Sequence, residues 1–336
     1  MAAVLELYYK ELGQLRALVP NVILPLAQRL EAAGHPGISR VLLTFKGRTS
    51  AGTNPRDVEV LKEALPPSMD VSCVWSAKMA YVGSGKKARG EHASREDATY
   101  ARFREYAADV GKAGCSAVLV VSGAGAKKAL DSVETLSRLA AGPQPDNLAA
   151  LALGVAFNPH IGGTLDPSGG AAEREAEWGR LERKLASGAV SEIWIAFGAD
   201  VAALQASLAR LQLKFGHMDV HARPRLYGSV FVPSKAWLGK MRFRCWNGTY
   251  LGGNDDPGGY LSGVEAATAV TQKTMALFAR YGVVPVVESS VRTEREVADA
   301  AQMLLGAAAA RPPLGEAGPA QAKRLKVEPA AAAVAE

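Results

Sequence analysis

Short apolar runs alternate with amphipathic segments along most of the chain. Runs rich in Val, Ile, Leu and aromatic residues begin at positions 41, 71, 117, 151, 192, 225 and 283. Most are separated by segments with apolar residues at three- and four-residue spacing, at 95–114, 131–142, 173–189, 201–216, 263–282 and 293–306. Strand-type runs that alternate with helical patterns are typical of a parallel sheet covered by helices. The pattern therefore predicts an α/β fold.

A closed barrel and an open doubly wound sheet share this alternation. No GxGxxG motif follows the first run to favour a dinucleotide-binding open sheet. A barrel needs an eighth strand, which VLELYY at 4–9 could supply. However, residues 3–33 also have helical spacing, interrupted by Pro20 and Pro25 and closed by Gly34. We expect residues 1–306 to form a TIM-type (β/α)8 barrel as a single domain.

Residues 307–336 lack this alternation. They are rich in Ala, Pro and Gly without periodicity, which predicts a disordered tail. Within the tail, Lys323, Arg324 and Lys326 form a compact basic cluster that resembles a short Myc-type nuclear localisation signal. Such matches arise often by chance, so a cytoplasmic location and import by a nuclear receptor both stay open.

The composition narrows the class of protein. With 336 residues and 48% hydrophobic content, the chain can bury a large core. No apolar run reaches the roughly 18 residues of a membrane span, and the first residues carry acids where a signal peptide would carry bases. We therefore expect a soluble intracellular protein with no membrane partner. The three cysteines, Cys73, Cys115 and Cys245, lack CxxC spacing and are expected to pack as small apolar residues.

Positive charge is concentrated in one region. The net charge is +6, and between Arg40 and Arg95 ten Lys or Arg residues stand against five acids. This excess could steer an anionic ligand, such as a phosphate-bearing cofactor or a polyglutamate tail, or could be a solvated surface. The aromatic residues are not interleaved with these charges as in nucleic-acid-binding proteins, so a nucleic-acid partner is not expected.

Two loops and several polar residues follow the predicted strands. Segments 79–93 and 237–262 are predicted to be loops that border a pocket, or exposed insertions. Arg242 and Arg244, near Trp237 and Trp246, could form a stacking and anion-binding lip, or simply cover a loop. Ser76 and Lys78 end one strand. Glu288 and Arg292 close the last strand and could pair with each other.

Three segments, in order, resemble the methylenetetrahydrofolate reductase family. AVLVVSGAGAKKALDSVETLSRLA resembles the family's fourth strand and next helix. LALGVAFNPH, with the helix through RLERKLASGA, resembles the family's fifth strand and the helix that follows it. EIWIAFGAD resembles the sixth strand. The resemblance is clearest over residues 115–202 and excludes the tail. It implies an eight-stranded barrel that holds FAD at the carboxyl ends of its strands and passes hydride from NAD(P)H to a folate-type substrate.

The resemblance also implies site residues. Lys184 matches a flavin-contacting lysine, Glu177 an acid of the same helix, and Gly123 the turn glycine after the fourth strand, with Ser122 beside it. Asp200 matches the Asp that ends the sixth-strand motif. We accordingly expect Ser122, Gly123, Glu177 and Lys184 to bind the cofactor, and Asn158, His160 and Asp200 to bind the substrate; no metal site is indicated.

Several positions depart from the family. Ala124 stands in place of an Asp beside the flavin, and Ala196 in place of a substrate-contacting Gln; Asn158 replaces a Tyr, and His160 a Glu. The family's general acid is a Glu on the first strand, and Glu6 could take this role only if VLELYY is that strand. These departures leave a second hypothesis open, a barrel that binds a folate or nucleotide or regulates without turnover. The sequence identifies no catalytic residue and does not decide whether the protein forms a homo-oligomer.

Overall fold

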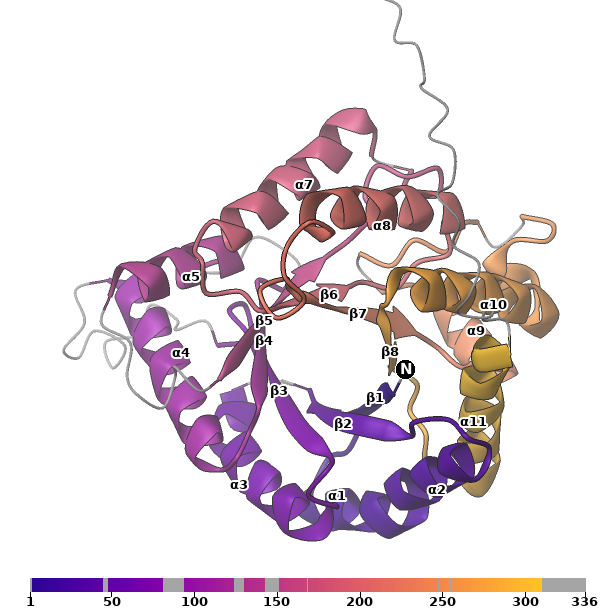
Figure 1. Ribbon diagram of the computed structural model, residues 1–336, viewed down its shortest axis with the longest axis horizontal. Helices are drawn as coiled ribbons and strands as arrows, with labels where there is room; N and C mark the ends of the chain where they lie inside the picture. The colour runs from indigo at the N-terminus through magenta and orange to yellow at the C-terminus, as the bar shows by residue number, and fades with distance from the viewer. Residues whose placement is uncertain are drawn as a thin grey trace, which may run out of the picture.

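Eight parallel strands close into a barrel in the computed structural model (Figure 1). The structure describes residues 2–44, 48–80, 94–123, 130–142, 151–167, 169–246, 248–253 and 256–309. Each strand pairs with the next, and β1 pairs with β8, so the predicted TIM-type barrel is confirmed. The strands are β1 Ala3–Leu7, β2 Ile38–Leu43, β3 Asp70–Ser76, β4 Ala117–Val121, β5 Ala152–Phe157, β6 Glu192–Ile195, β7 Arg225–Val230 and β8 Val284–Val287.

The first segment of the chain supplies the closing strand. Residues 3–7 form β1 rather than the start of a helix, and the helical part begins at Leu12. Pro20 and Pro25 do not interrupt it, because the chain passes from α1 through a π-helical turn into α2. The prediction that residues 3–33 are helical is therefore wrong for the first turns, and the alternative of a strand is confirmed.

Helices surround the barrel (Figure 1). The predicted helices from 95, 131, 173, 201, 263 and 293 are confirmed, while α3 had no predicted counterpart. The segment 237–262 is not a continuous loop, since α9 and the 3-10 turn η3 occupy parts of it. The helices are α1 Leu12–Leu18, η1 Val19–Ile23, α2 Leu24–Ala32, α3 Arg48–Ala64, α4 Arg95–Lys112, α5 Ser132–Ala141, α7 Ala171–Leu185, α8 Val201–Phe215, α9 Lys235–Phe243, η3 Tyr260–Ser262, α10 Val264–Tyr281 and α11 Glu294–Ala309.

Side-chain caps fix where several of these helices begin. Ser94, Asp131, Asp200 and Ser234 each precede a helix and accept a hydrogen bond from a backbone N–H of its first turn. Capping satisfies N–H groups that have no partner inside the helix. The sequence thus sets the start of α4, α5, α8 and α9, each of which follows a strand end.

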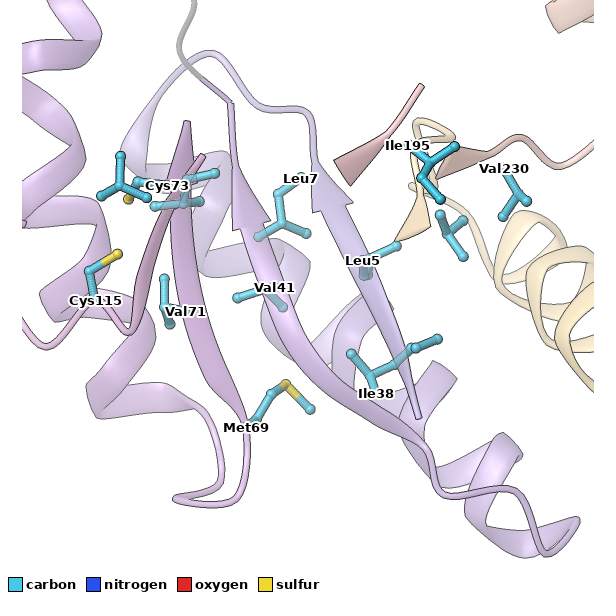
Figure 2. Packing of buried hydrophobic residues seen from close by; sticks show 14 of the residues in the cluster. Leu5, Leu7, Ile38, Val41, Met69, Val71, Cys73, Cys115, Ile195 and Val230 are labelled. Atoms are coloured by element: carbon cyan, nitrogen blue, oxygen red, sulfur yellow. The ribbon is translucent and has the colours of Figure 1, made fainter. Parts of the chain in front are cut away.

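The main core lies between the barrel and its helices. Alternate residues of the strands, such as Leu5, Leu7 and Val41, pack outward with helical residues into one large buried cluster. Figure 2 shows part of this cluster, in which Cys73 and Cys115 also lie. Both are buried, as expected for small apolar packing, whereas Cys245 is exposed, so that expectation is wrong for the third cysteine.

The other strand residues face the interior and fill its amino-terminal end. Arg40 donates to Glu192 Oε1 at 2.7 Å, and Trp194 Nε1 donates to Glu192 Oε2 at 3.0 Å. The Trp194 ring stacks on Tyr227, with ring centroids 4.5 Å apart. Gly154 leaves room for this packing, since a Cβ there would lie 2.5 Å from Trp194 Nε1. Arg40, one of the residues counted in the basic region, is therefore a buried ion-pair partner and not a surface charge.

Some predicted features lie outside the described residues. They include residues 81–93, Ala124 and the tail beyond Ala309; α11 extends three residues past the predicted domain end at 306. Nuclear import through Lys323, Arg324 and Lys326 therefore stays a prediction. Among the described helices, none has the length and apolar character needed to cross a bilayer.

Candidate functional site

A pocket of about 610 Å³ opens at the carboxyl end of the barrel. Its lining comes from residues that directly follow β1, β2, β7 and β8, from α3, and from α9 and the segment after it. Active sites of (β/α)8 enzymes lie at this end, because the loops there vary while the strands hold them rigidly. The pocket is therefore the candidate site.

Two carboxyl groups stand here on neighbouring strands. Leu5 of β1 pairs with Val287 of β8, so Glu6 lies level with Glu288. Ser229 Oγ donates a hydrogen bond to Glu288 Oε1. Burial raises the pKa of Glu288 to about 7, although the hydrogen bond from Ser229 acts in the opposite direction. A carboxyl group that changes charge near neutral pH can hold or release a proton where a ligand binds.

Tyr8 lies next to both carboxyl groups. It lines the pocket and faces the same side of β1 as Glu6, because side chains alternate along a strand. Burial raises the pKa of Tyr8 well above its ordinary value, and the charges of Glu6 and Glu288 and a hydrogen bond with Glu6 act in the same direction. The phenol therefore stays protonated and is the donor in its hydrogen bond with Glu6.

Three aromatic rings form one wall of the pocket. Phe231, directly after β7, stacks on Trp237 of α9, with centroids 3.9 Å apart and an angle of 6° between the planes. Trp246 meets both rings edge-on, at 5.6 and 5.1 Å. Ser234 Oγ accepts a hydrogen bond from the Trp237 N–H at 3.1 Å, so the cap of α9 positions this wall. Phe231 is 2% exposed, so the half-buried Trp237 and Trp246 supply most of the apolar surface that a ligand ring can meet.

Cationic side chains surround the opening. Lys10, Lys240 and Arg292 line the pocket and are exposed. The Lys240 ammonium lies 4.9 Å from the centre of the Trp246 ring. Arg292 donates to the Tyr8 carbonyl at 3.3 Å, and Glu288 accepts from Ser229. The predicted pair of Glu288 with Arg292 is therefore not formed. The rim is suited to an anionic group on the ligand.

The opposite wall is polar and tied to the helices. Tyr9 Oη donates to Asp57 Oδ2 at 2.6 Å, and Asn54 Nδ2 donates to Tyr106 Oη at 2.8 Å. Thr44 Oγ1 is shielded from solvent and has no hydrogen-bond partner within the described ranges. These contacts hold α3 against β1 and α4, and so fix the width of the pocket.

The two predicted cofactor residues after β4 lie together. Ser122 Oγ accepts from the Ser132 N–H at 2.9 Å, which ties the turn to the start of α5. Gly123 has a φ of 76°, and a Cβ on it would lie 2.7 Å from Lys78 Cβ and 3.1 Å from Ser76 Oγ. Glycine is therefore required both by the left-handed conformation and by close packing on the end of β3.

Glu177 and Lys184 lie behind β5 and are buried. Glu177 Oε1 accepts from the Asn158 N–H at 3.0 Å, and its other oxygen pairs with Arg180 at 2.6 Å. Lys184 Nζ donates to the Ala156 carbonyl at 2.7 Å. Both side chains hold α7 against the end of β5. Contact of either one with a flavin stays a prediction, and Lys184 would have to leave Ala156 to make it.

The three predicted substrate residues lie at the ends of β5 and β6. Asn158 Oδ1 accepts from the His160 N–H at 3.1 Å, and Asn158 Nδ2 donates to the Gly248 carbonyl at 2.7 Å. Burial lowers the pKa of His160 to about 4, against the opposing charge of Asp200. Asp200 caps α8 and accepts from both the N–H and the hydroxyl of Thr164 at 2.8 Å. These residues cluster together, apart from the pocket lining over β1 and β8.

Sequence reasoning found some pocket residues and missed others. The prediction that segment 237–262 borders a pocket is confirmed for Trp237 and Trp246. Arg242 instead donates to the Leu261 carbonyl at 2.7 Å and holds η3. The motif comparison gave no role to Tyr8, Phe231 or Ser229, although the alternation along VLELYY and RLYGSVFV could have placed them. In the parts of the chain that the structure describes, His, Cys, Asp and Glu form no group suited to a metal ion.

Comparison with known proteins assigns the chain to no family. No family model and no curated protein matches the chain. Solved structures similar to it include N-acetylneuraminate lyase from Fusobacterium nucleatum, with 9% identity and a TM-score of 0.47 over 91% of this chain and 75% of that chain. Dihydropteroate synthase from Xanthomonas albilineans has 12% identity and a TM-score of 0.43 over 93% and 94%. A chitinase domain from Pyrococcus furiosus has 9% identity and a TM-score of 0.44, over 85% of this chain and 83% of that chain. At this level the likeness concerns the barrel only.

Proposed function

We propose that the protein is an oxidoreductase of the methylenetetrahydrofolate reductase type, with a folate-type substrate bound in the pocket at the carboxyl end of the barrel. The observation that carries the proposal is the position of Glu6. The resemblance requires a Glu on the first strand as general acid, and VLELYY does form that strand, with Glu6 beside the pocket. General acid catalysis contributes typically about 10² to 10⁴ in rate.

The lining of the pocket supports a ligand of folate type. A ring can lie against Trp237 and Trp246, and the carboxylates of a glutamate tail can meet Lys10, Lys240 and Arg292. The volume of about 610 Å³ is in the usual range for small-molecule sites. The rim cations lie outside the basic region between Arg40 and Arg95, so attraction of an anionic ligand by that region stays a prediction.

In the proposed reaction Glu6 supplies the proton. Tyr8, which lines the pocket, donates a hydrogen bond to Glu6 and would hold its carboxyl group in place. A proton delivered to a substrate nitrogen makes the adjacent carbon electrophilic and ready to accept hydride. FAD, when bound, would supply that hydride transfer from NAD(P)H.

The described residues fit FAD only in part. Ser122 and Gly123 follow β4 at the open end of the barrel, where the resemblance puts the flavin. Lys184 does not fit a pyrophosphate as it lies here, because its side chain is buried and its ammonium group is bound to the Ala156 carbonyl. We therefore assign flavin contact to none of the side chains of α7.

This misfit favours a second candidate, a barrel that binds a folate or nucleotide without turnover and acts in regulation, in the cytoplasm or the nucleus. Glu177 and Lys184 stabilise the scaffold in this candidate, and Ala196 offers no polar group to a substrate. The ligand pocket is common to both candidates, so they differ in the flavin and in turnover.

The visible spectrum of purified protein, before and after incubation with FAD, separates the two. The first candidate predicts bound flavin and flavin-dependent oxidation of NAD(P)H by a folate acceptor. A colourless protein that takes up no FAD, yet binds a folate, would favour the second.

Glu6→Gln tests the proposed acid. We expect turnover to fall by about 10²-fold or more while folate affinity changes little, since the amide keeps the shape but donates no proton. Glu265→Gln, on the exposed surface of α10, is the matched control and should keep full activity. Unchanged turnover in Glu6→Gln would remove Glu6 from the mechanism.

A further inference from the structure

Glu288 is a half-buried carboxyl group whose hydrogen bonds within the described residues are incomplete. At the amino-terminal end, Glu192 accepts from Arg40 with one oxygen and from Trp194 with the other. At the carboxyl end, Glu288 Oε1 accepts from the neutral Ser229 hydroxyl, and within the described ranges Oε2 has no donor and no cation forms an ion pair with the group. The second oxygen therefore lies open to the pocket, where a ligand with N–H groups can donate to it.

The surroundings of Glu288 define what can supply those donors. Phe231, one strand over, is 2% exposed and covered by Trp237, so the aromatic surface near the carboxyl group belongs mainly to the half-buried Trp237 and Trp246. On β6, the residue level with Ser229 is Ala196, one position beyond the pair of Ile195 and Gly228, and it carries no polar group. A flat ligand here therefore meets a carboxyl group at its edge and aromatic carbon on its face.

We propose that Glu288, held by Ser229, is the ligand-binding carboxylate of this pocket, and that it accepts hydrogen bonds from two adjacent N–H groups at the edge of a planar heteroaromatic ring. An amino group next to a ring amide N–H, as in pterins and guanines, presents two parallel donors at the spacing of a carboxylate's two oxygens. The choice of a pterin as the ring rests on the proposed function, whereas the recognition of two adjacent N–H groups rests on the pocket itself. Glu288 thus determines which ring binds.

The charge of Glu288 gives this recognition a pH dependence. As a carboxylate, Glu288 accepts two hydrogen bonds; once protonated, it presents a donor to a donor edge. With a pKa of about 7, the ionised fraction rises about tenfold from pH 6 to pH 8, and ring affinity should rise by a similar factor. Within the described part of the chain, the other charged or titratable groups at or next to the pocket are Glu6, Tyr8, Tyr9 with its partner Asp57, Lys10, Lys240 and Arg292.

The binding of pterin, followed by its fluorescence, tests the proposal on the whole protein. Wild type should bind about tenfold more tightly at pH 8 than at pH 6. Glu288→Gln should weaken binding at pH 8 by about tenfold or more and flatten the profile, since a charged hydrogen bond is lost. Ser229→Ala should shift the profile to higher pH, because the donor that stabilises the carboxylate is gone.

Three controls separate recognition from general damage. Lumazine has the pterin ring with a carbonyl in place of the amino group, and should lose less affinity than pterin in Glu288→Gln. In Glu6→Gln, pterin affinity should still depend on pH, with a shifted midpoint. In Glu265→Gln, the pH dependence should equal that of the wild type. Circular dichroism should show a folded barrel in every variant compared.

Each outcome decides one proposal. Pterin binding that is independent of pH and unaffected in Glu288→Gln overturns the inference, as does a wild type that binds no pterin. A protein that binds pterin with the expected profile but takes up no flavin supports the inference and overturns the reductase. Flavin-dependent turnover together with pterin binding that does not change with pH supports the reductase and overturns the inference.

Discussion

The carboxyl groups of Glu192 and Glu288, at opposite ends of the barrel, have different surroundings. Glu192 has its two oxygens satisfied by Arg40 and Trp194, and the Arg40 guanidinium lies 5.1 Å from the centre of the Tyr227 ring. Glu288 accepts a hydrogen bond from the Ser229 hydroxyl and lines the pocket. The first arrangement closes the amino-terminal end of the barrel, where polar residues commonly serve stability. The second leaves a group that can respond to a ligand.

The Arg40–Glu192 pair is the clearest stability test at this scale. Its side chains are 6% and 2% exposed. Arg40→Ala should lower the free energy of unfolding by about 3–5 kcal/mol, since it leaves Glu192 charged and buried. Urea denaturation measures the loss. The matched control is Arg29→Ala, whose pair with Glu294 is 44% and 88% exposed and should contribute at most about 1 kcal/mol. Equal losses would contradict the assignment.

His160 should make stability fall in mild acid. Its pKa is lowered by burial from 6.5 to about 4, so the folded protein holds the neutral ring. This contribution is fully present above pH 6.5 and is lost as the pH falls toward 4, since the unfolded chain takes up the proton first. The total is about 3 kcal/mol.

Urea denaturation between pH 7 and pH 4 measures this loss. The apolar variant His160→Phe should have a shallower pH dependence, whatever its absolute stability. His217→Asn, at an exposed position, should keep the slope of the wild type. An unchanged slope in His160→Phe would mean that other groups cause the acid sensitivity.

At the scale of elements, the ends of helices define the ends of strands. Asp200 ends the EIWIAFGAD motif, and its Oδ1 accepts from the Ala203 N–H at 2.9 Å while Oδ2 accepts twice from Thr164. The cap thus fixes α8 to the loop after β5. A motif residue expected at a substrate site also has a complete structural role, and substrate contact stays a prediction.

Asp200→Ala should lower stability by about 1–2 kcal/mol, because the first turn of α8 loses its cap. Asp200→Asn should cost less, since an amide oxygen still accepts. Burial acts to raise the pKa of Asp200, but hydrogen bonds from Ala203 and Thr164 outweigh it and lower the pKa. The carboxylate therefore contributes stability above its ordinary pKa of 3.8, and this is lost as the pH falls through the lowered value. Urea titrations at pH 7 and pH 3 should show the difference between wild type and Asp200→Asn shrinking in acid.

The elements that the sequence predicts well are those with one clear period. Runs such as AVLVV and EIWI cannot form an amphipathic helix of useful length, and segments such as 201–216 repeat at helical spacing over four turns. The segment 235–243 is short, contains Gly239 and follows a proline, so local pattern did not separate it from a loop. Its Ser234 cap, accepting from Trp237, was the available signal.

At the scale of the whole molecule, closure of the barrel creates the candidate site. Glu6 lies on the first strand, Tyr8 directly after it, and Glu288 directly after the eighth. They meet because β1 and β8 pair. A short run such as VLELYY fits strand and helix equally, and which residues share a level depends on register across the closed sheet. The alternation thus predicted the barrel, but not the carboxyl pair or the aromatic wall, which need three-dimensional pairing.

The closing strand should therefore control the stability of the entire barrel. Leu5 of β1 is 1% exposed and packs in the main core. Leu5→Ala should lower the free energy of unfolding by about 2–5 kcal/mol, from lost burial and the cavity left behind. Leu213→Ala, at a position 82% exposed on α8, is the matched control and should change it by no more than about 0.5 kcal/mol.

Because β1 is bonded to both β2 and β8, its loss should not be local. Tryptophan fluorescence reports on tertiary packing around all five tryptophans, among them Trp194 inside the barrel, and circular dichroism reports on the surrounding helices. In Leu5→Ala both signals should move to lower urea together, as one cooperative transition. If the helices kept their wild-type midpoint while the fluorescence changed earlier, β1 would be an independent edge rather than the strand that closes the barrel and assembles the pocket.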